Sequence, residues 1–162
     1  MTRVVPRPIG AIVVLAATLL VGPSVLFAKA PPSDRCALLP TSELQSVLAQ
    51  SFENPSTSTA PSPYAGLPPG TDCTYSAGQS GGQVLFRIYV DPSAAIAKET
   101  FLKLSLFYPA KSKPPHLGDS AYIDTSDAIH VLKGSVRFYI NVEPAAKAKQ
   151  LVDLATFVSG QL

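Results

Sequence analysis

The sequence predicts a small α+β domain in which an antiparallel sheet of about five strands packs with two or three helices. Two observations lead to this fold class. Apolar residues alternate with polar ones in several short segments, as in half-buried strands, and recur at helical spacing in others. Turn residues separate the segments, and a glycine-rich turn at residues 78–82 joins two predicted strands into a hairpin.

The first 28 residues predict a secretory signal peptide. Two arginines precede an uncharged run at residues 9–27, and a basic start before a short apolar stretch is typical of an export signal. We expect cleavage after Ala28, because cleavage after Ala30 would leave Pro31 at the first mature position. The protein is then exported, to the periplasm or outside the cell. The alternative is an uncleaved N-terminal anchor, which is the only membrane attachment expected.

Residues 29–162 are expected to form a single secreted domain with one core. The whole chain has 13 basic and 11 acidic residues, and removal of Arg3 and Arg7 with the signal peptide leaves equal numbers. No polybasic block or basic stripe is present in the sequence, so nucleic acid is not an expected partner.

The two cysteines, Cys36 and Cys73, predict one disulfide in an exported chain. A redox-active dithiol would need a closer spacing, such as Cys-x-x-Cys. The bond would close a loop that contains residues 54–70, which are rich in Pro, Ser and Thr. We expect this segment to form neither helix nor strand.

Three segments predict helices. The first opens at residues 40–42, where Ser42 and Gln45 have the spacing of a capping box. The second follows Asp91-Pro92-Ser93, a typical helix start, and ends at Pro109. The third begins at Pro144 and carries an apolar face that packs on the sheet.

The strands are predicted from alternation. In the two longest segments, apolar side chains point one way and polar or aromatic side chains point the other. Residues 111–115, between the second helix and the next strand, are expected to be a loop. The first predicted strand begins at Cys73, and the others cover residues 84–90, 121–123, 128–132 and 135–142.

Several short motifs run through residues 35–162: Cys36-Ala37-Leu38-Leu39 before Thr41-x-Glu43-Leu44, then Cys73-Thr74-Tyr75, then Leu117-Gly118-Asp119-x-Ala121-Tyr122, and a final amphipathic helix. With them the chain resembles the secreted domains of bacterial LpqN-like lipoproteins and related extracellular sensor domains. The resemblance implies a PsbP-like α+β fold, and most members have no established activity. The lipobox cysteine of that family is absent from this sequence.

His116 and His130 are the only histidines in the sequence. A zinc site would combine them with Asp119 or Asp124, but the sequence has no His-x-His or His-Glu-x-x-His spacing. Ser120 next to Asp119 lacks the Gly-x-Ser-x-Gly turn that exposes a nucleophilic serine. We therefore expect no metal, no cofactor and no catalytic constellation.

Two cation–aromatic pairs, Arg87 with Tyr89 and Arg137 with Tyr139, fall on strand faces that point away from the core. Such a surface suits an envelope protein, a glycan or a lipid head group. The other interpretation is that helices cover this face.

The function predicted from these observations is a non-catalytic secreted binding or sensor-type domain of unknown ligand. The alternative is a small envelope hydrolase or metalloenzyme that uses His116 or His130.

Overall fold

The computed structural model describes residues 32–78 and 81–162. The predicted signal peptide lies outside these residues, as do the two central residues of the predicted turn at 78–82. The described elements are, in chain order, the 3-10 helix η1 (Cys36–Leu38), α1 (Thr41–Leu48), β1 (Ser56–Ala60), β2 (Gly70–Ser76), β3 (Gln83–Val90), α2 (Ala94–Phe107), β4 (Ala110–Ser112), β5 (Ser120–Asp124), β6 (Ile129–Lys133), β7 (Val136–Glu143) and α3 (Ala148–Gln161).

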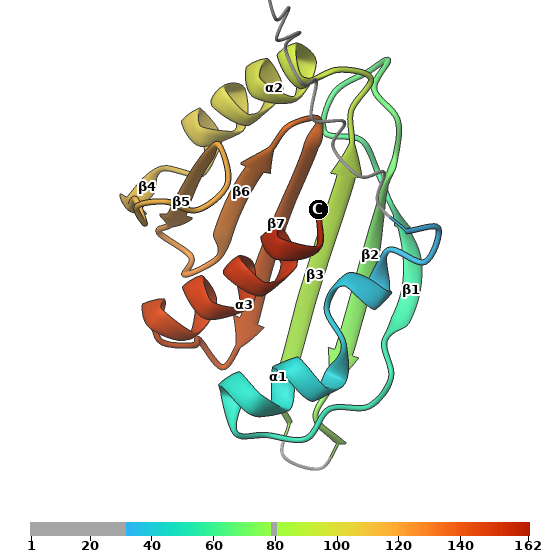
Figure 1. Cartoon of the computed structure of the whole chain (residues 1–162), viewed down its shortest axis with the longest axis vertical. Helices are drawn as coiled ribbons and strands as arrows, with labels where there is room; N and C mark the ends of the chain where they lie inside the picture. Colours follow the sequence, from blue (N-terminus) through green and yellow to red (C-terminus); the bar gives the residue numbers. More distant parts are fainter. Residues whose placement is uncertain (1–31, 79–80) are drawn as a thin grey trace, which may run out of the picture.

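The strands form one antiparallel sheet in the order β1-β2-β3-β7-β6-β5-β4 (Figure 1). The α+β class, the single antiparallel sheet and the three α-helices are thus confirmed. The number of strands is corrected, because the sheet has seven strands rather than about five.

The two additional strands lie at the edges of the sheet. β1 lies within the segment at residues 54–70 that was expected to form no strand, and it pairs with β2. β4 overlaps the start of the expected loop at residues 111–115 and pairs with β5. Pro55 and Pro61 flank β1, and Pro109 precedes β4, so the prolines bound these strands without interrupting them. Proline is compatible with the ends of edge strands, which is why a proline-rich composition misled the prediction.

The main core lies between one face of the sheet and the helices α1 and α3, which cross that face in Figure 1. Alternate residues of β3 and β7 point into it, as predicted, and the Phe86 and Phe138 rings meet edge to face with centroids 6.0 Å apart. Leu44 of α1 and Leu151 and Leu154 of α3 are fully buried against them.

The predicted disulfide is confirmed: Cys36 of η1 is bonded to Cys73 of β2. Beside it the buried Tyr75 hydroxyl lies 2.6 Å from the carbonyl oxygen of Leu39 and 3.1 Å from that of Cys36. The bond and this hydroxyl together hold η1 against the sheet.

The helix starts agree with the predictions only in part. The second helix starts where predicted, but its cap is Ser93, whose hydroxyl accepts the backbone N–H of Ile96 at 3.3 Å. Asp91, the residue expected to cap it, is paired with Arg137 instead. The expected capping box at Ser42 is wrong, because α1 begins at Thr41 after Pro40 and has no side-chain cap. The third helix begins at Ala148, later than predicted.

The Leu117-Gly118-Asp119 motif is structural. Gly118 has φ +57°, and a Cβ there would collide with the backbone oxygen of Leu132, so only glycine fits without strain. Asp119 does not bond the backbone of its own turn, although aspartates in turns commonly do. Its carboxylate accepts the backbone N–H of Gly134 at 2.6 Å, and it thereby fixes the turn between β6 and β7.

The helix α2 packs on the opposite face of the sheet from α1 and α3. Ala97 and Phe101 of α2 form a second, smaller core with Tyr122 and Leu132, and the Phe101 and Tyr122 rings lie 5.2 Å apart. Because this core involves only one end of the sheet, the rest of the face is left to polar and aromatic side chains.

Candidate binding site

A row of aromatic and charged side chains crosses the α2 side of the sheet. It consists of Asp72 on β2, Arg87 on β3, Tyr139 on β7, His130 on β6 and Tyr122 on β5, each the direct cross-strand neighbour of the next. We call these residues the aromatic row. Antiparallel register brings opposite residues to the same face, so one line across the sheet collects side chains that are distant in sequence.

The planar groups of the aromatic row stack on one another. The His130 ring lies 4.6 Å from the Tyr122 ring and 5.4 Å from the Tyr139 ring, with interplanar angles of 11° and 23°. The Arg87 guanidinium follows, 5.3 Å from the centre of the Tyr139 ring. Tyr108, just after α2, stacks on His130 from above at 5.6 Å. The result is a firmly packed aromatic surface.

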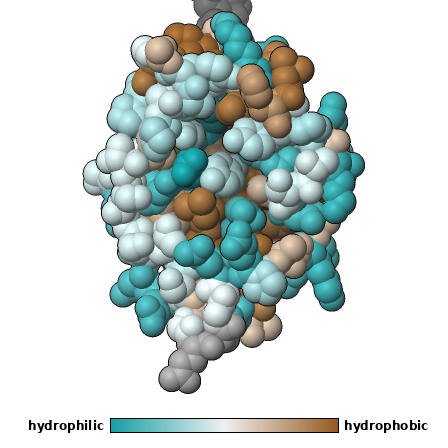
Figure 2. Space-filling model, turned by 180° about the vertical axis from the view of Figure 1, so that it is seen from behind, coloured by the Kyte–Doolittle hydropathy of each residue, from teal (hydrophilic) through white to brown (hydrophobic). Residues whose placement is uncertain are grey.

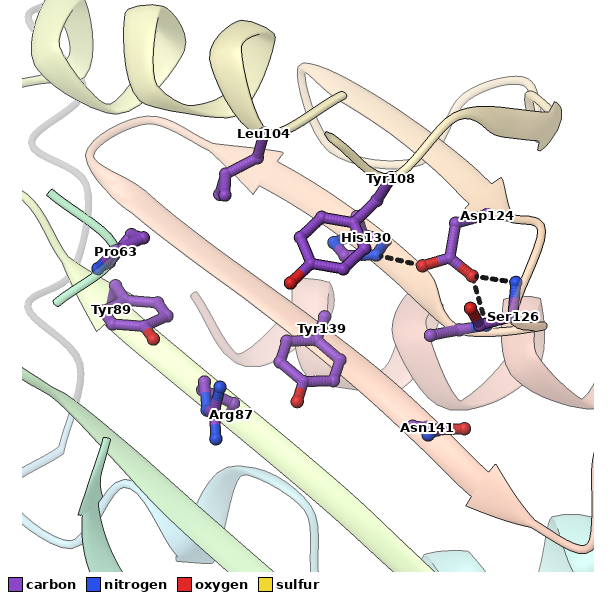
Figure 3. A pocket seen from close by; sticks show the side chains of 11 residues that line it. Pro63, Arg87, Tyr89, Leu104, Tyr108, Asp124, Ser126, His130, Tyr139 and Asn141 are labelled. Atoms are coloured by element: carbon purple, nitrogen blue, oxygen red, sulfur yellow. Dashed lines mark hydrogen bonds and ion pairs between the residues drawn. The ribbon is translucent and has the colours of Figure 1, made fainter. Parts of the chain in front are cut away.

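Three members of the aromatic row, Arg87, Tyr139 and His130, line a cavity of about 270 Å³. Figure 3 shows Arg87, Tyr139 and Asn141 projecting from the strands, Leu104 and Tyr108 reaching over from α2, and Pro63 on the far side. In Figure 2, which views this face of the molecule, apolar atoms lie in its middle within a polar surround. The cavity thus combines ring faces with hydrogen-bonding groups.

The charged groups on this face are already paired. Arg87 donates from Nε and Nη2 to the two carboxylate oxygens of Asp72, the second at 2.7 Å, and this bond raises the pKa of Arg87. Arg137 donates to both oxygens of Asp91 at 2.5 and 3.0 Å and stacks on Tyr89 at 4.8 Å. Both arginines are held in fixed orientations by bidentate carboxylates.

Asp124 positions the imidazole of His130. Its Oδ1 accepts the backbone N–H groups of Ser126 and Ala128 at 2.9 and 3.0 Å, and its Oδ2 lies 2.8 Å from Nε2 of His130. Burial lowers the pKa of His130, although the Asp124 bond acts in the opposite direction. We therefore assign a neutral ring that donates from Nε2 to Asp124 and keeps Nδ1 as an acceptor.

The buried imidazole predicts a pH dependence of stability. In the unfolded chain His130 titrates near its ordinary value of 6.5, whereas burial lowers its pKa in the folded protein. As the pH falls below about 6.5, the unfolded state takes up a proton that the folded state resists, so the free energy of unfolding decreases until the folded pKa is passed. Urea unfolding from about pH 8 to about pH 5 should show a smaller decrease for His130→Asn than for the unchanged protein.

His116→Asn is the matched control for this measurement. His116 is exposed and has φ +59°, a backbone conformation that asparagine adopts readily. This variant should keep the full pH dependence. If His130→Asn kept it as well, the titrating group would be another residue.

The four residues predicted to bind a partner all lie on the predicted face, but two of them are not accessible. Tyr89 is 6% exposed and Arg137 is 3% exposed. Neighbouring structure covers them: the Tyr89 hydroxyl donates to the carbonyl of Pro61 at 3.0 Å, and Arg137 is enclosed with Asp91. Of the four predicted residues, only Arg87 and Tyr139 are therefore accessible to a partner.

The two histidines do not form a common site. His130 is buried beside Asp124. His116 precedes β5 and lies near Asp119 and Ser159 at a separate surface hollow. Within residues 32–78 and 81–162, no three His, Cys, Asp or Glu side chains gather closely enough to hold a metal ion.

Two residues of the site, Asn141 and Tyr108, were not among those predicted from the sequence. Asn141 follows Arg137 and Tyr139 at a spacing of two, so strand alternation alone could have placed it on the same face. Tyr108 falls in the segment predicted as the second helix, and no local signal shows that its ring reaches over the neighbouring strands. The bond between Asp124 and His130 depends on how a hairpin closes.

Neither a scan against protein-family models nor a search of curated proteins gives a match to this chain. In the part of the chain that the structure describes, there is no helix with the length and apolarity of a membrane span.

Proposed function

We propose that this chain is a non-catalytic, exported binding domain whose cavity holds a small uncharged ring, such as one sugar residue of a glycan. The observation that carries the proposal is the composition of the cavity. It offers aromatic faces and hydrogen-bonding groups, while its charged side chains are already paired.

The size of the cavity favours a ligand of one ring. Ligand pockets commonly measure about 300–1,000 Å³, and this one, at about 270 Å³, lies just below that range. A sugar ring would place its C–H groups on the face of Tyr139 or Tyr108. Its hydroxyls could bond the Asn141 amide, the Ser126 hydroxyl and Nη1 of Arg87, which the Asp72 pair does not use.

The charge pattern favours a neutral ligand over an anion. An anionic ligand would have to compete with Asp72 for Arg87 and would lie near the carboxylate of Asp124. A neutral polyol disturbs neither pair. It needs only the donors and acceptors that remain free at the rim.

The alternative function is a hydrolase in which His130 acts as a base. The Asp124–His130 bond supports it, because a carboxylate that orients an imidazole is part of many nucleophilic sites. Among the described residues, however, no hydroxyl is hydrogen-bonded to Nδ1 of His130, and burial disfavours the protonated imidazole that would follow proton transfer. Binding without chemistry is the better supported function.

Titration with neutral sugars tests the proposal. The probes are glucose, galactose, mannose and N-acetylglucosamine, followed by amide NMR shifts of the protein that begins at Lys29. We expect at least one sugar to shift the amides around Tyr139 and Asn141. Tyr108→Ala should weaken its binding about tenfold, since a stacked ring contributes roughly 1–2 kcal/mol.

Leu106→Ser is the matched control, because Leu106 lies two residues before Tyr108, at the end of α2, and does not line the cavity. It should leave binding unchanged. The proposal fails if none of these sugars shifts the cavity amides, or if the Leu106 variant weakens binding as much as the Tyr108 variant. Release of acetate from N-acetylglucosamine, the one probe with a hydrolysable bond, would favour the hydrolase.

A further inference from the structure

The outer surface of α2 carries exposed apolar side chains in its last two turns. Leu102, Leu106 and Phe107 are 56%, 79% and 72% exposed, and Tyr108 just after the helix is 48% exposed. These are the large hydrophobic side chains that the described residues leave exposed, and brown atoms lie over α2 in Figure 2. A cluster of this kind marks an interaction surface more often than scattered single residues do.

Lysines surround this apolar surface. Residues four apart on a helix are neighbours, so Lys98 precedes Leu102 and Leu106 in one line, and Lys103 lies beside Phe107. Lys111 and Lys113, in and just after β4, are exposed next along the chain. Apolar side chains flanked by lysines have the composition of a helix that lies in a membrane interface.

The local charge is positive. Two acidic residues lie in this region, and each is ion-paired: Glu99 with Lys103 at 2.6 Å and Asp127 with Lys111 at 2.7 Å. Lys98 and Lys113 have no ion-pair partner within the described part of the chain. An anionic surface would therefore be attracted to this side of the molecule.

We propose that α2 docks the protein on an anionic lipid surface. Leu102, Leu106 and Phe107 enter the interface between head groups and acyl chains, while Lys98 and Lys113 contact the lipid phosphates. This proposal does not depend on the sugar ligand, because these side chains point away from the cavity.

A second copy of the chain fits this surface less well. Two identical surfaces facing each other across a two-fold axis would bring the lysines of one copy against those of the other. An anionic lipid surface has an apolar interior for the apolar side chains of α2 and negatively charged head groups for the lysines around them.

Co-sedimentation with vesicles tests the docking. The protein beginning at Lys29 is suitable, because every residue of both cores lies at Cys36 or later and the predicted signal peptide is absent. We expect binding to vesicles of phosphatidylglycerol and phosphatidylcholine, and little binding to phosphatidylcholine alone. Added salt should weaken the binding, since the lysine contribution is screened.

Two double variants separate the apolar and the cationic contributions. Leu106→Ser with Phe107→Ser, and Lys98→Glu with Lys113→Glu, should each reduce vesicle binding by about tenfold or more. All four positions are exposed, so the fold should be kept, and circular dichroism checks this. The control is Lys147→Glu with Lys149→Glu on the α3 side, which makes the same charge change and should keep vesicle binding.

Three results would overturn the proposal. They are equal binding to both kinds of vesicle, an equal loss in the α3-side control, and no loss in either α2 variant. A dimer in vesicle-free sedimentation that the Leu106 and Phe107 change dissociates would assign the surface to a second copy instead.

Discussion

Replacement of Arg137 by methionine is expected to lower the free energy of unfolding by about 3–5 kcal/mol. The side chains of Arg137 and Asp91 are 3% and 1% exposed, and the guanidinium donates two hydrogen bonds to this carboxylate. Without it, Asp91 would remain buried with its charge uncompensated. Urea unfolding at neutral pH measures the loss.

Two comparisons show whether burial causes this effect. Arg137→Met combined with Asp91→Leu should recover much of the stability, because the unpaired charge is then gone. Arg87→Met should cost less, since the Arg87–Asp72 pair is partly open to water. A loss below about 1 kcal/mol for Arg137→Met would mean that water reaches Asp91, and that the predicted surface role of Arg137 should be reconsidered.

Loss of the disulfide is expected to lower the free energy of unfolding by roughly 3–4 kcal/mol. Cys36 and Cys73 are 37 positions apart, and without the bond the unfolded chain regains the freedom of that loop. The strands from β3 to β7 and the helix α3 lie outside the loop, so the fold should survive at lower stability. Unfolding with and without reductant gives the difference.

The variant with both cysteines replaced by alanine is the control for the reductant. It should unfold at the lower stability under both conditions and show no further response to reduction. Two reactive thiols in the native, unreduced protein would contradict the disulfide, and an unchanged unfolding midpoint after reduction would contradict its contribution to stability.

The central strands could be predicted because their local pattern and their environment agree. In β3 and β7 each second side chain is apolar and enters the main core, so period-two alternation is sufficient to find them. The start of α2 is equally local, since the Ser93 cap bonds a backbone group three residues away. The disulfide could be predicted because the sequence has two cysteines and the chain is expected to be exported.

The edge strands could not be predicted in the same way. β1 consists of five residues and β4 of three, and their side chains are small or polar. They form strands because a neighbouring strand offers its hydrogen-bonding edge. Nothing in their own sequence requires an extended pairing, and the nearby prolines argue against it. Pairing with a partner distant in the chain overcomes the weak local preference.

The candidate site shows the same division. Strand alternation alone places Arg87, Tyr89, Arg137 and Tyr139 on the face of the sheet away from the main core, because successive side chains point to opposite faces. It does not show which of these four side chains water can reach. That depends on where α2 and the β1–β2 loop lie, and on long-range pairs such as Arg137 with Asp91 and Asp124 with His130. Alternation is a property of the local backbone, whereas coverage and charge pairing depend on which distant segments pack together.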